Sequence, residues 1–359
     1  MGKWTNKTLN GFVRKGTTLT STSMCDGEYP VVAGGLDYAG VHNVYNRLEK
    51  CITISASGAN AGAVRFHKTK IFATDCSTVI WNYCQEYLYY ELLRRQQQIF
   101  RMQTGLAQPH IYPRDIEKIE VHYPKSLTEQ KKIAEILMTI DEAIEKTCAI
   151  IEKYTMIKQG LMQDLLSKGK NILLKKVAKV KMGQSPNNMS VNSDGYGIAF
   201  LQGNGEFGYK NPQEIFWCTQ PKKIALVGAL LISVRAPVGD VNIANKDYCI
   251  GRGLATINFW GIDKTYAYYL LKKSIKQLHL VSQGTTFLAV NKNDIENMIL
   301  RISPKLSTQI EIANQLTTAD DKIQSERDYL VKLENIKSGL MQDLLTNKVK
   351  VDKLLKERI

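Results

Sequence analysis

Two long segments of the chain place apolar residues at steps of mainly three and four, the spacing of a helix with one apolar face. One segment runs from Thr128 to Leu166 and the other from Thr308 to Leu345, and neither contains a proline. A helix of roughly 40 residues is about 60 Å long at 1.5 Å per residue. The predicted apolar seam consists of Ile133, Leu137, Ile140, Ile144, Ile151, Tyr154, Ile157, Leu161 and Leu165 in the first helix, and of Ile312, Leu316, Ala319, Ile323, Leu330, Leu333, Ile336, Leu340 and Leu344 in the second.

The two segments are copies of one another. The heptapeptide GLMQDLL stands at Gly160–Leu166 and again at Gly339–Leu345, a separation of 179 positions. At that separation, 17 of the 37 residues from Gln130 to Leu166 are identical to those from Gln309 to Leu345. The same separation pairs Tyr89-Tyr90 with Tyr268-Tyr269, Asp141 with Asp320 and Lys158 with Lys337. A repeat of this length is far longer than a solenoid unit, so it indicates a duplicated domain together with its helix.

The remaining regions have the patterns of mixed α and β structure. Short β-branched segments broken by glycines fill residues 50–81 and 229–259, and amphipathic helices are predicted at residues 85–103 and 264–283. We therefore predict an α+β fold with two strand-rich α/β globular domains, at residues 1–125 and 171–303. The helical regions 126–170 and 304–359 are predicted to form an antiparallel two-helix coiled coil that separates the domains, because the second helix must run back along the first. The duplication then has a pseudo-twofold axis.

Composition narrows the class of protein. The apolar content of 44% is that of a globular chain, and the longest apolar run, Ile224–Val234, is too short to span a bilayer. The seven cysteines contain no CxxC pair and the five histidines are dispersed, which predicts reduced thiols and no metal site. We expect a cytoplasmic protein without membrane contact.

The positive charge is concentrated in the two globular regions. The chain has a net charge of +14, and residues 1–125 carry 15 Lys and Arg against 10 Asp and Glu. Residues 171–303 carry 16 against 8, whereas residues 126–170 carry 7 of each. A basic globular surface indicates a polyanionic partner, most simply double-stranded DNA, although many soluble proteins are basic without binding nucleic acid.

Cations and polar side chains that suit phosphates and base edges are candidates for DNA contact. Arg94, Gln98 and Arg101 fall on one stripe of the helix predicted at residues 85–103. The predicted DNA-binding residues are Arg65, Arg94, Gln98, Arg101, Arg235, Arg252, Lys273, Gln277 and Thr285. Lys273 and Gln277 correspond to Arg94 and Gln98 in the second copy, and Arg65 and Arg235 stand beside glycine turns suited to entering a groove. A solvated helix face or a structural ion pair is the alternative for these side chains.

Motifs that carry catalysis give no convincing match. GNGEFG at Gly203–Gly208 fits the dinucleotide pattern G-x-G-x-x-G, but no helix pattern follows it, so a glycine loop is the better interpretation. NPQE at Asn211–Glu214 lacks the second proline and the aromatic residue of an amino-methyltransferase site. Walker A, His-Glu-x-x-His and G-x-S-x-G patterns are missing from the sequence. We therefore predict no catalytic residues.

The order of variable region, helix, variable region and helix resembles the specificity (S) subunit of type I restriction–modification systems. The resemblance is carried by PKSLTEQKKIAEILMTIDEAIE with LMQDLLSKG in the first copy, and by SPKLSTQIEIANQLTTADDKI with LMQDLLTNKVKV in the second. The helices look like that family's two conserved regions, and the strand-rich regions resemble its target recognition domains. The resemblance covers essentially the whole chain.

This resemblance implies a non-catalytic subunit that recognises a bipartite, asymmetric DNA site, with one half read by each domain. It also implies that the helix pair docks two copies of a methyltransferase (M) subunit, which methylates adenine with S-adenosylmethionine. Restriction (R) subunits would join where the system cleaves DNA, and this chain would bind no cofactor itself. The alternatives are a stand-alone coiled-coil DNA-binding or scaffold protein without a methyltransferase partner, and a solitary enzyme that binds S-adenosylmethionine.

Overall fold

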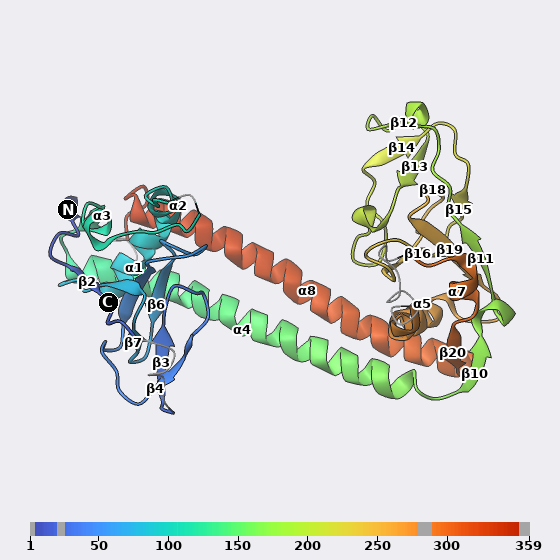
Figure 1. The fold of residues 1–359 in the computed structure, drawn as a ribbon, viewed down its shortest axis with the longest axis horizontal. Coiled ribbons are helices and arrows are strands. Elements are labelled where there is room, and N and C mark those ends of the chain that lie inside the picture. The colour runs from blue at the N-terminus through green and yellow to red at the C-terminus, as the bar shows by residue number, and fades with distance from the viewer. Residues whose placement is uncertain (1–3, 20–25, 106, 279–288, 352–359) are drawn as a thin grey trace. The chain divides into compact units, whose positions relative to one another are not determined.

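The computed structural model describes residues 4–19, 26–105, 107–278 and 289–351 (Figure 1). The chain divides into two compact units, one made of Met1–Cys148 with Asp328–Ile359 and the other of Ala149–Arg327. Two long helices, α4 (Leu127–Leu165) and α8 (Leu306–Leu345), contribute a stretch to each unit. Each unit therefore combines one globular domain with parts of both long helices.

The described residues of the first unit's domain form three small sheets. β1 (Trp4–Thr8) pairs with β9 (Glu120–Pro124), and a four-stranded antiparallel sheet has the order β2 (Val13–Lys15), β8 (Cys76–Val79), β5 (Cys51–Ser55), β6 (Val64–His67). The third sheet has the order β4 (Gly40–His42), β3 (Tyr29–Val32), β7 (Phe72–Ala73), with β3 and β7 parallel. The short helices are α1 (Gln85–Arg94), α2 (Gln96–Phe100) and α3 (Pro113–Ile116). Every residue of β5 is buried, which its β-branched sequence CITIS suits.

The domain of the second unit repeats this plan. β10 (Lys170–Leu173) pairs with β20 (Ile299–Ile302), and a four-stranded antiparallel sheet has the order β11 (Ala178–Met182), β19 (Leu254–Phe259), β16 (Leu230–Ser233), β17 (Val241–Ile243). A five-stranded sheet has the order β12 (Val191–Asn192), β14 (Phe216–Cys218), β13 (Ile198–Leu201), β18 (Tyr248–Ile250), β15 (Ile224–Ala225). The helices are α5 (Lys264–Ser274) and α7 (Lys292–Glu296), with 3-10 turns η2 (Leu174–Lys176), η3 (Asn188–Ser190) and η4 (Asn204–Glu206).

The duplication seen in the sequence is confirmed element by element. Adding 179 to the numbers of β5, β8, α1 and α3 leads to β16, β19, α5 and α7. The remaining sheet differs: in both domains it contains one parallel pair, β3–β7 or β13–β18, but within the described residues it has three strands in the first and five in the second. The two domains thus share one frame and diverge in this sheet.

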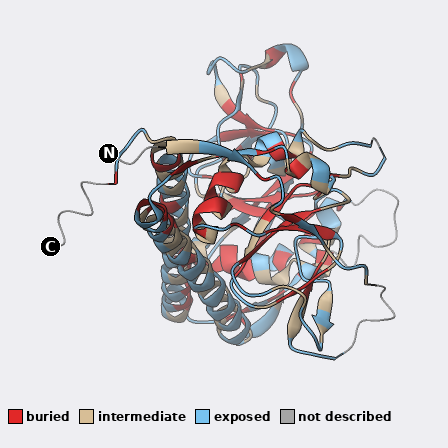
Figure 2. Cartoon of the chain, turned by 90° about the vertical axis from the view of Figure 1, so that its left-hand side faces the viewer, coloured by how far each residue is buried: buried red, intermediate tan, exposed pale blue. Residues whose placement is uncertain are grey.

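The long helices run antiparallel within each unit. In the first unit, Leu340 and Leu344 of α8 join the core that holds Ile133 and Leu137 of α4. In the second unit, Leu161 and Leu165 of α4 lie with Ile312 and Leu316 of α8. In both, the start of one helix meets the end of the other, as predicted. Figure 2 shows the contrast between the buried strands and the exposed outer faces of the long helices.

Two details of the sequence interpretation are wrong. The helix predicted at residues 85–103 is broken at Arg95, where α1 gives way to α2. Of the seam residues, Ile157 and Ile336 are 44% and 49% exposed, while the other sixteen are buried or half-buried. The first turns of each long helix also pack into the core of their own domain, so the seam serves two partners.

Candidate nucleic-acid interface and helix junctions

A buried carboxylate joins the long helices to the domain in the second unit. Asp320 of α8 is 1% exposed, and its carboxylate accepts hydrogen bonds from the hydroxyls of Tyr269 (2.6 Å) and Tyr209 (2.8 Å). The Lys158 ammonium of α4 forms an ion pair with the same carboxylate and lies 5.7 Å from the centre of the Tyr269 ring. Burial alone would raise the pKa of Asp320, but Lys158 and the two hydroxyls outweigh it and hold that pKa below its ordinary value.

The first unit contains the equivalent junction. Asp141 of α4 accepts a hydrogen bond from the Tyr90 hydroxyl (2.7 Å) and forms an ion pair with Lys337 of α8 (2.6 Å). Tyr90, Asp141 and Lys337 correspond to Tyr269, Asp320 and Lys158 by the duplication. The Asp141 and Lys337 side chains are each 22% exposed, so this copy is more open to solvent. Tyr209 has no counterpart among the recorded partners of Asp141, so the second junction has one more donor.

A buried glutamine fixes the start of each long helix. The Gln130 amide accepts from the Cys84 backbone N–H (3.1 Å) and donates to the Pro124 carbonyl (2.8 Å). Its counterpart Gln309 accepts from the Asp263 N–H (2.9 Å) and donates to the Ser303 carbonyl (2.7 Å). Because these four backbone partners are also related by 179 positions, each helix leaves its domain with the same fixed geometry.

The glycine loop Gly203–Gly208 belongs to the second junction. The Glu206 carboxylate accepts hydrogen bonds from the backbone N–H groups of Gln202 and Gly203, both at 3.1 Å, and so closes the loop on itself. Directly after the loop, Tyr209 contacts Asp320 and the Lys210 ammonium lies 3.3 Å from the Asp321 carboxylate. These contacts tie the end of the loop to α8. The loop therefore has a structural role, which agrees with the interpretation of this sequence as a glycine loop.

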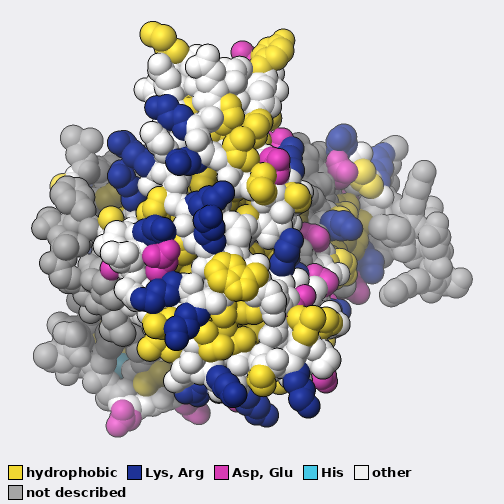
Figure 3. All heavy atoms as spheres, turned by 90° about the vertical axis from the view of Figure 1, so that its right-hand side faces the viewer, with side chains coloured by type: hydrophobic (Ala, Val, Ile, Leu, Met, Phe, Trp, Pro, Cys, Tyr) yellow, Lys and Arg dark blue, Asp and Glu magenta, His cyan; other side chains and the backbone are white. Residues whose placement is uncertain are grey.

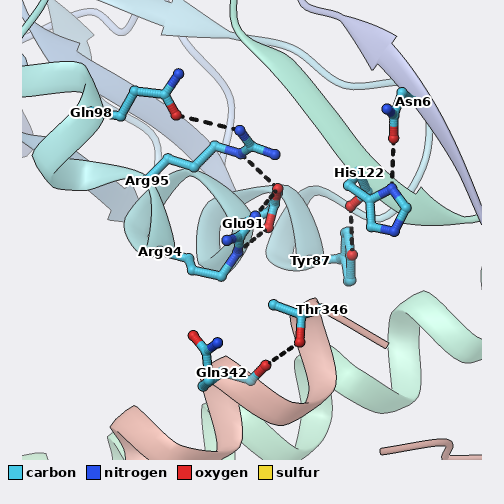
Figure 4. A network of polar contacts seen from close by, with 9 residues as sticks. All are labelled: Asn6, Tyr87, Glu91, Arg94, Arg95, Gln98, His122, Gln342 and Thr346. Carbon is cyan, nitrogen blue, oxygen red and sulfur yellow. Dashed lines mark hydrogen bonds and ion pairs between the residues drawn. The ribbon is translucent and has the colours of Figure 1, made fainter. Parts of the chain in front are cut away.

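The candidate cation Arg94 shares one buried carboxylate with its neighbour Arg95 (Figure 4). Glu91 is fully buried, and its oxygens accept from Arg94 (2.8 Å) and from Arg95 (2.7 Å). The Glu91 carboxylate raises the pKa of Arg94 and holds its guanidinium charged. Arg95 also donates to Gln98 (3.4 Å), and Arg101 is exposed beyond the end of α2. The break at Arg95 therefore separates Arg94, which stabilises the core, from Gln98 and Arg101, which face solvent.

The other candidates lie in different surroundings. Arg65 packs 5.2 Å from the centre of the Tyr38 ring, and Arg235 and Arg252 are exposed. Lys273 donates to the Gln163 carbonyl near the end of α4 (2.9 Å), and Gln277 bonds both the N–H and the carbonyl of Ile299. Thr285 lies outside the described residues. DNA contact by these nine residues stays a prediction, and the structural contacts of Arg94, Lys273 and Gln277 favour the alternative for those three.

The second domain presents a basic surface. Figure 3 shows Lys and Arg side chains spread over the face of the molecule that lies on the right of Figure 1. The exposed lysines of this domain include Lys175, Lys176, Lys179, Lys181, Lys222, Lys223, Lys246 and Lys264. Lys181 on the edge strand β11 lies opposite Thr256, and Lys15 on the edge strand β2 lies opposite Ser77, the equivalent position. An exposed cation thus recurs at the same edge of both domains.

Comparison with known proteins decides the family. The model of the type I restriction modification DNA specificity domain matches residues 1–153 and again residues 169–335. The chain belongs to this family. Among members of the specificity-subunit family, the "Putative type I restriction enzyme MjaX specificity subunit" of Methanocaldococcus jannaschii is 35% identical over 292 residues, which cover 74% of this chain and 68% of that protein. The type I restriction enzyme MjaVIII specificity subunit of the same organism is 25% identical, covering 85% of this chain and 80% of its own.

The fold of the specificity subunit is shared with solved structures. The crystal structure of the type I restriction–modification S subunit from M. genitalium superposes with a TM-score of 0.73 at 18% identity, over 96% of each chain. A structure described as the basis of complex assembly and conformational transition of the type I R-M system gives a TM-score of 0.59 at 19% identity, over 96% of this chain and 97% of that one. Across the described residues, no helix combines the length and the apolarity needed to cross a membrane.

The residues of the two junctions can be found in the sequence as repeated positions. Tyr90, Asp141 and Lys337, with their copies, were recognised as repeated positions, but repetition alone does not reveal that three repeated residues meet. The signal for a contact is that an acid, a base and a tyrosine are kept in both copies while most of the residues around them differ. The role of Arg94 was also open to inference, because Glu91 stands three residues before it on a helix.

Proposed function

We propose that the two domains of this specificity subunit bind the two halves of one bipartite DNA site. The observation that carries the proposal is a shared frame with one divergent sheet. The four-stranded sheet, the helix and the junction recur, while the remaining sheet, over the residues that the structure describes, has three strands in one domain and five in the other. Two domains with the same frame but different DNA-contacting surfaces suit two half-sites of different sequence. The whole site is then asymmetric. Joined readers also bind more tightly than either alone, because the second contact becomes intramolecular.

The long helices are proposed to set the spacing between the half-sites. α4 has 39 residues and α8 has 40, both without a break, so each keeps a constant rise per residue. Gln130 and Gln309 fix where each helix leaves its domain, and the two junctions fix the register of one helix against the other. Spacing on DNA is a geometric quantity of about 34 Å per turn, which a helix pair of fixed register can match.

The chemistry is proposed to belong to partner subunits. Two copies of a methyltransferase (M) subunit would bind the helix pair, supply S-adenosylmethionine and methylate adenine, while this chain binds no cofactor. Exposed apolar side chains on the long helices, Ile150 and Met156 on α4 and Tyr329 and Val331 on α8, supply surface for such docking. Restriction (R) subunits would add cleavage of unmodified DNA.

Mapping of adenine methylation tests this function. The chain is expressed with its methyltransferase subunit in a host that lacks other adenine methylation, and the methylated positions are mapped across the genome. We expect one split, asymmetric motif that disappears when the chain is omitted. Methylation that persists without the chain would refute the proposal.

Binding to DNA provides a second, independent test. The purified complex should lose affinity steeply with salt, because cations that neutralise phosphates release counterions. A scaffold without DNA affinity would give no such salt dependence. Binding of S-adenosylmethionine by the purified chain alone would point instead to a solitary enzyme.

A further inference from the structure

The second domain has a hollow of about 750 Å³ beside the five-stranded sheet. Its lining includes Ser185, Asn188, Phe200, Gln202, Phe216 and Arg252. The lining contains one cation and no Asp or Glu, so the hollow favours a ligand rich in hydrogen-bond acceptors. Its volume lies within the range of sites that hold a small molecule or a flat group.

Arg252 and Gln202 each offer a donor group to a ligand in the hollow. Among the residues that the structure describes, neither the Arg252 guanidinium nor the Gln202 Nε2 group has a recorded hydrogen bond or ion pair. Gln202 Oε1 accepts from the Ser185 hydroxyl (3.3 Å), so the amide nitrogen is the end left for a partner. Phe216, which is 40% exposed, adds an apolar wall.

The backbone holds Arg252 beside Gln202. Arg252 stands between Gly251 and Gly253, and a Cβ at Gly251 would lie 2.7 Å from Gln202 Oε1. A Cβ at Gly253 would lie 2.6 Å from the Gln202 carbonyl oxygen, so only glycine lets the loop approach this closely. The Arg252 backbone N–H donates to the Ser185 hydroxyl (3.2 Å), the same group that orients Gln202. One serine therefore places both donors.

We propose that Arg252 and Gln202 read base edges in the half-site bound by the second domain. Arg252 presents a planar fork that matches the O6 and N7 acceptors of guanine, and the Gln202 Nε2 group suits the N7 acceptor of a neighbouring purine. Phe216 suits the methyl group of thymine. This assignment rests on the proposed function and names the part of the second domain that recognises sequence.

Base edges fit the hollow better than a backbone phosphate does. The exposed lysines of the domain, Lys181 and Lys223 among them, stand outside the lining and suit phosphates as mobile point charges. The hollow instead combines one fork-shaped cation, one oriented amide and an aromatic wall. The first domain has Ala73 at the position equivalent to Arg252, and this residue is buried in β7, so the two half-sites would be read by different side chains.

The test compares Arg252→Ala, Gln202→Ala and the control Lys223→Ala, each assembled with the methyltransferase subunit. Binding to a randomised DNA library gives the preference at every position of the site. We expect Arg252→Ala to reduce the preference at one position of one half-motif by about 5- to 150-fold, the range of one bidentate contact. Gln202→Ala should weaken the preference at an adjacent position. Lys223→Ala should weaken binding to all sequences alike and leave the motif unchanged.

Arg252→Gln separates recognition from folding. It should move the preference at that position from guanine towards adenine, a change that a misfolded domain cannot produce. If the wild-type complex selects a motif but Arg252→Ala and Gln202→Ala select the same motif with the same preference, this inference is wrong. If the wild-type complex selects no motif, the proposed function itself is wrong.

Discussion

Replacing the lysine of each junction tests whether the more buried ion pair, Lys158–Asp320, stabilises its unit more than the half-buried pair Lys337–Asp141 does. Lys158→Met removes the ammonium that forms the ion pair with the Asp320 carboxylate, while methionine keeps the packing of the aliphatic stem. Asp320 is 1% exposed, so its charge would stay buried without its ion-pair partner, while the hydroxyls of Tyr209 and Tyr269 still donate to it. Breaking a buried pair from one side costs about 3–5 kcal/mol of unfolding free energy.

Lys337→Met is the matched comparison in the first unit. There both charged side chains are 22% exposed, so water can replace part of what the ammonium supplied. We expect a cost of about 1–3 kcal/mol. Lys153→Met, an exposed change on α4, should stay within about 0.5 kcal/mol of the wild type.

Scanning calorimetry of the full chain measures these differences. Hydrogen exchange then assigns each transition to a unit, because β16 and β19 report on the second unit and β5 and β8 on the first. For a unit of this size, Lys158→Met should lower the Tm by roughly 6–20 °C. Adding Asp320→Asn to Lys158→Met should recover much of the loss, because the orphaned charge is removed. An equal or larger loss from Lys337→Met, or no recovery in the double variant, would refute the reasoning.

Further predictions concern pH, the candidate cations and the helix length. Burial, with a smaller effect of Arg65, lowers the pKa of His67 to about 4, so the first unit should lose about 3 kcal/mol as the pH falls from 6.5 to 4 and the unfolded histidine takes up a proton. Urea unfolding across this range should show the loss, and His67→Gln should flatten it; an unchanged slope would contradict this. Arg94→Ala should destabilise the first domain by about 1–3 kcal/mol in the same assay, whereas Arg101→Ala should leave stability unchanged and reduce the salt slope of DNA binding by about 1. Four residues inserted after Thr147 should lengthen the spacer in the methylation motif, and altered half-motifs would count against this.

The long helices and the duplication were predictable because each leaves a regular pattern in the amino-acid sequence. A seam at steps of three and four requires a helix, and a repeat of 179 positions requires two similar folds, so the α+β architecture and the antiparallel pairing followed. Ile157 and Ile336 were placed in the seam by periodicity alone, yet they are exposed. Periodicity identifies one face of a helix but does not tell how much of its length the partner covers.

The candidate DNA-contacting residues were less predictable, because a side chain can contact DNA only if other groups of the fold do not already bind it. Arg94 and Gln277 have residue types that suit DNA, but a buried carboxylate and a strand backbone bind them in the fold. Arg252 was one of nine candidates in the sequence, and only the approach of two glycines to Gln202 places it in a hollow, where its guanidinium has no recorded partner among the described residues. Such contacts join residues fifty positions apart, which no local pattern reveals.

Exchange of one domain tests the central claim, that each domain reads its own half of the site, most directly. Residues 171–303 are replaced by the corresponding region of another specificity subunit, and the methylated motif is mapped beside that of the wild type. We expect the half read by the second domain to change while the other half and the spacer length stay the same. A motif that does not change, or one in which both halves change, would contradict the claim.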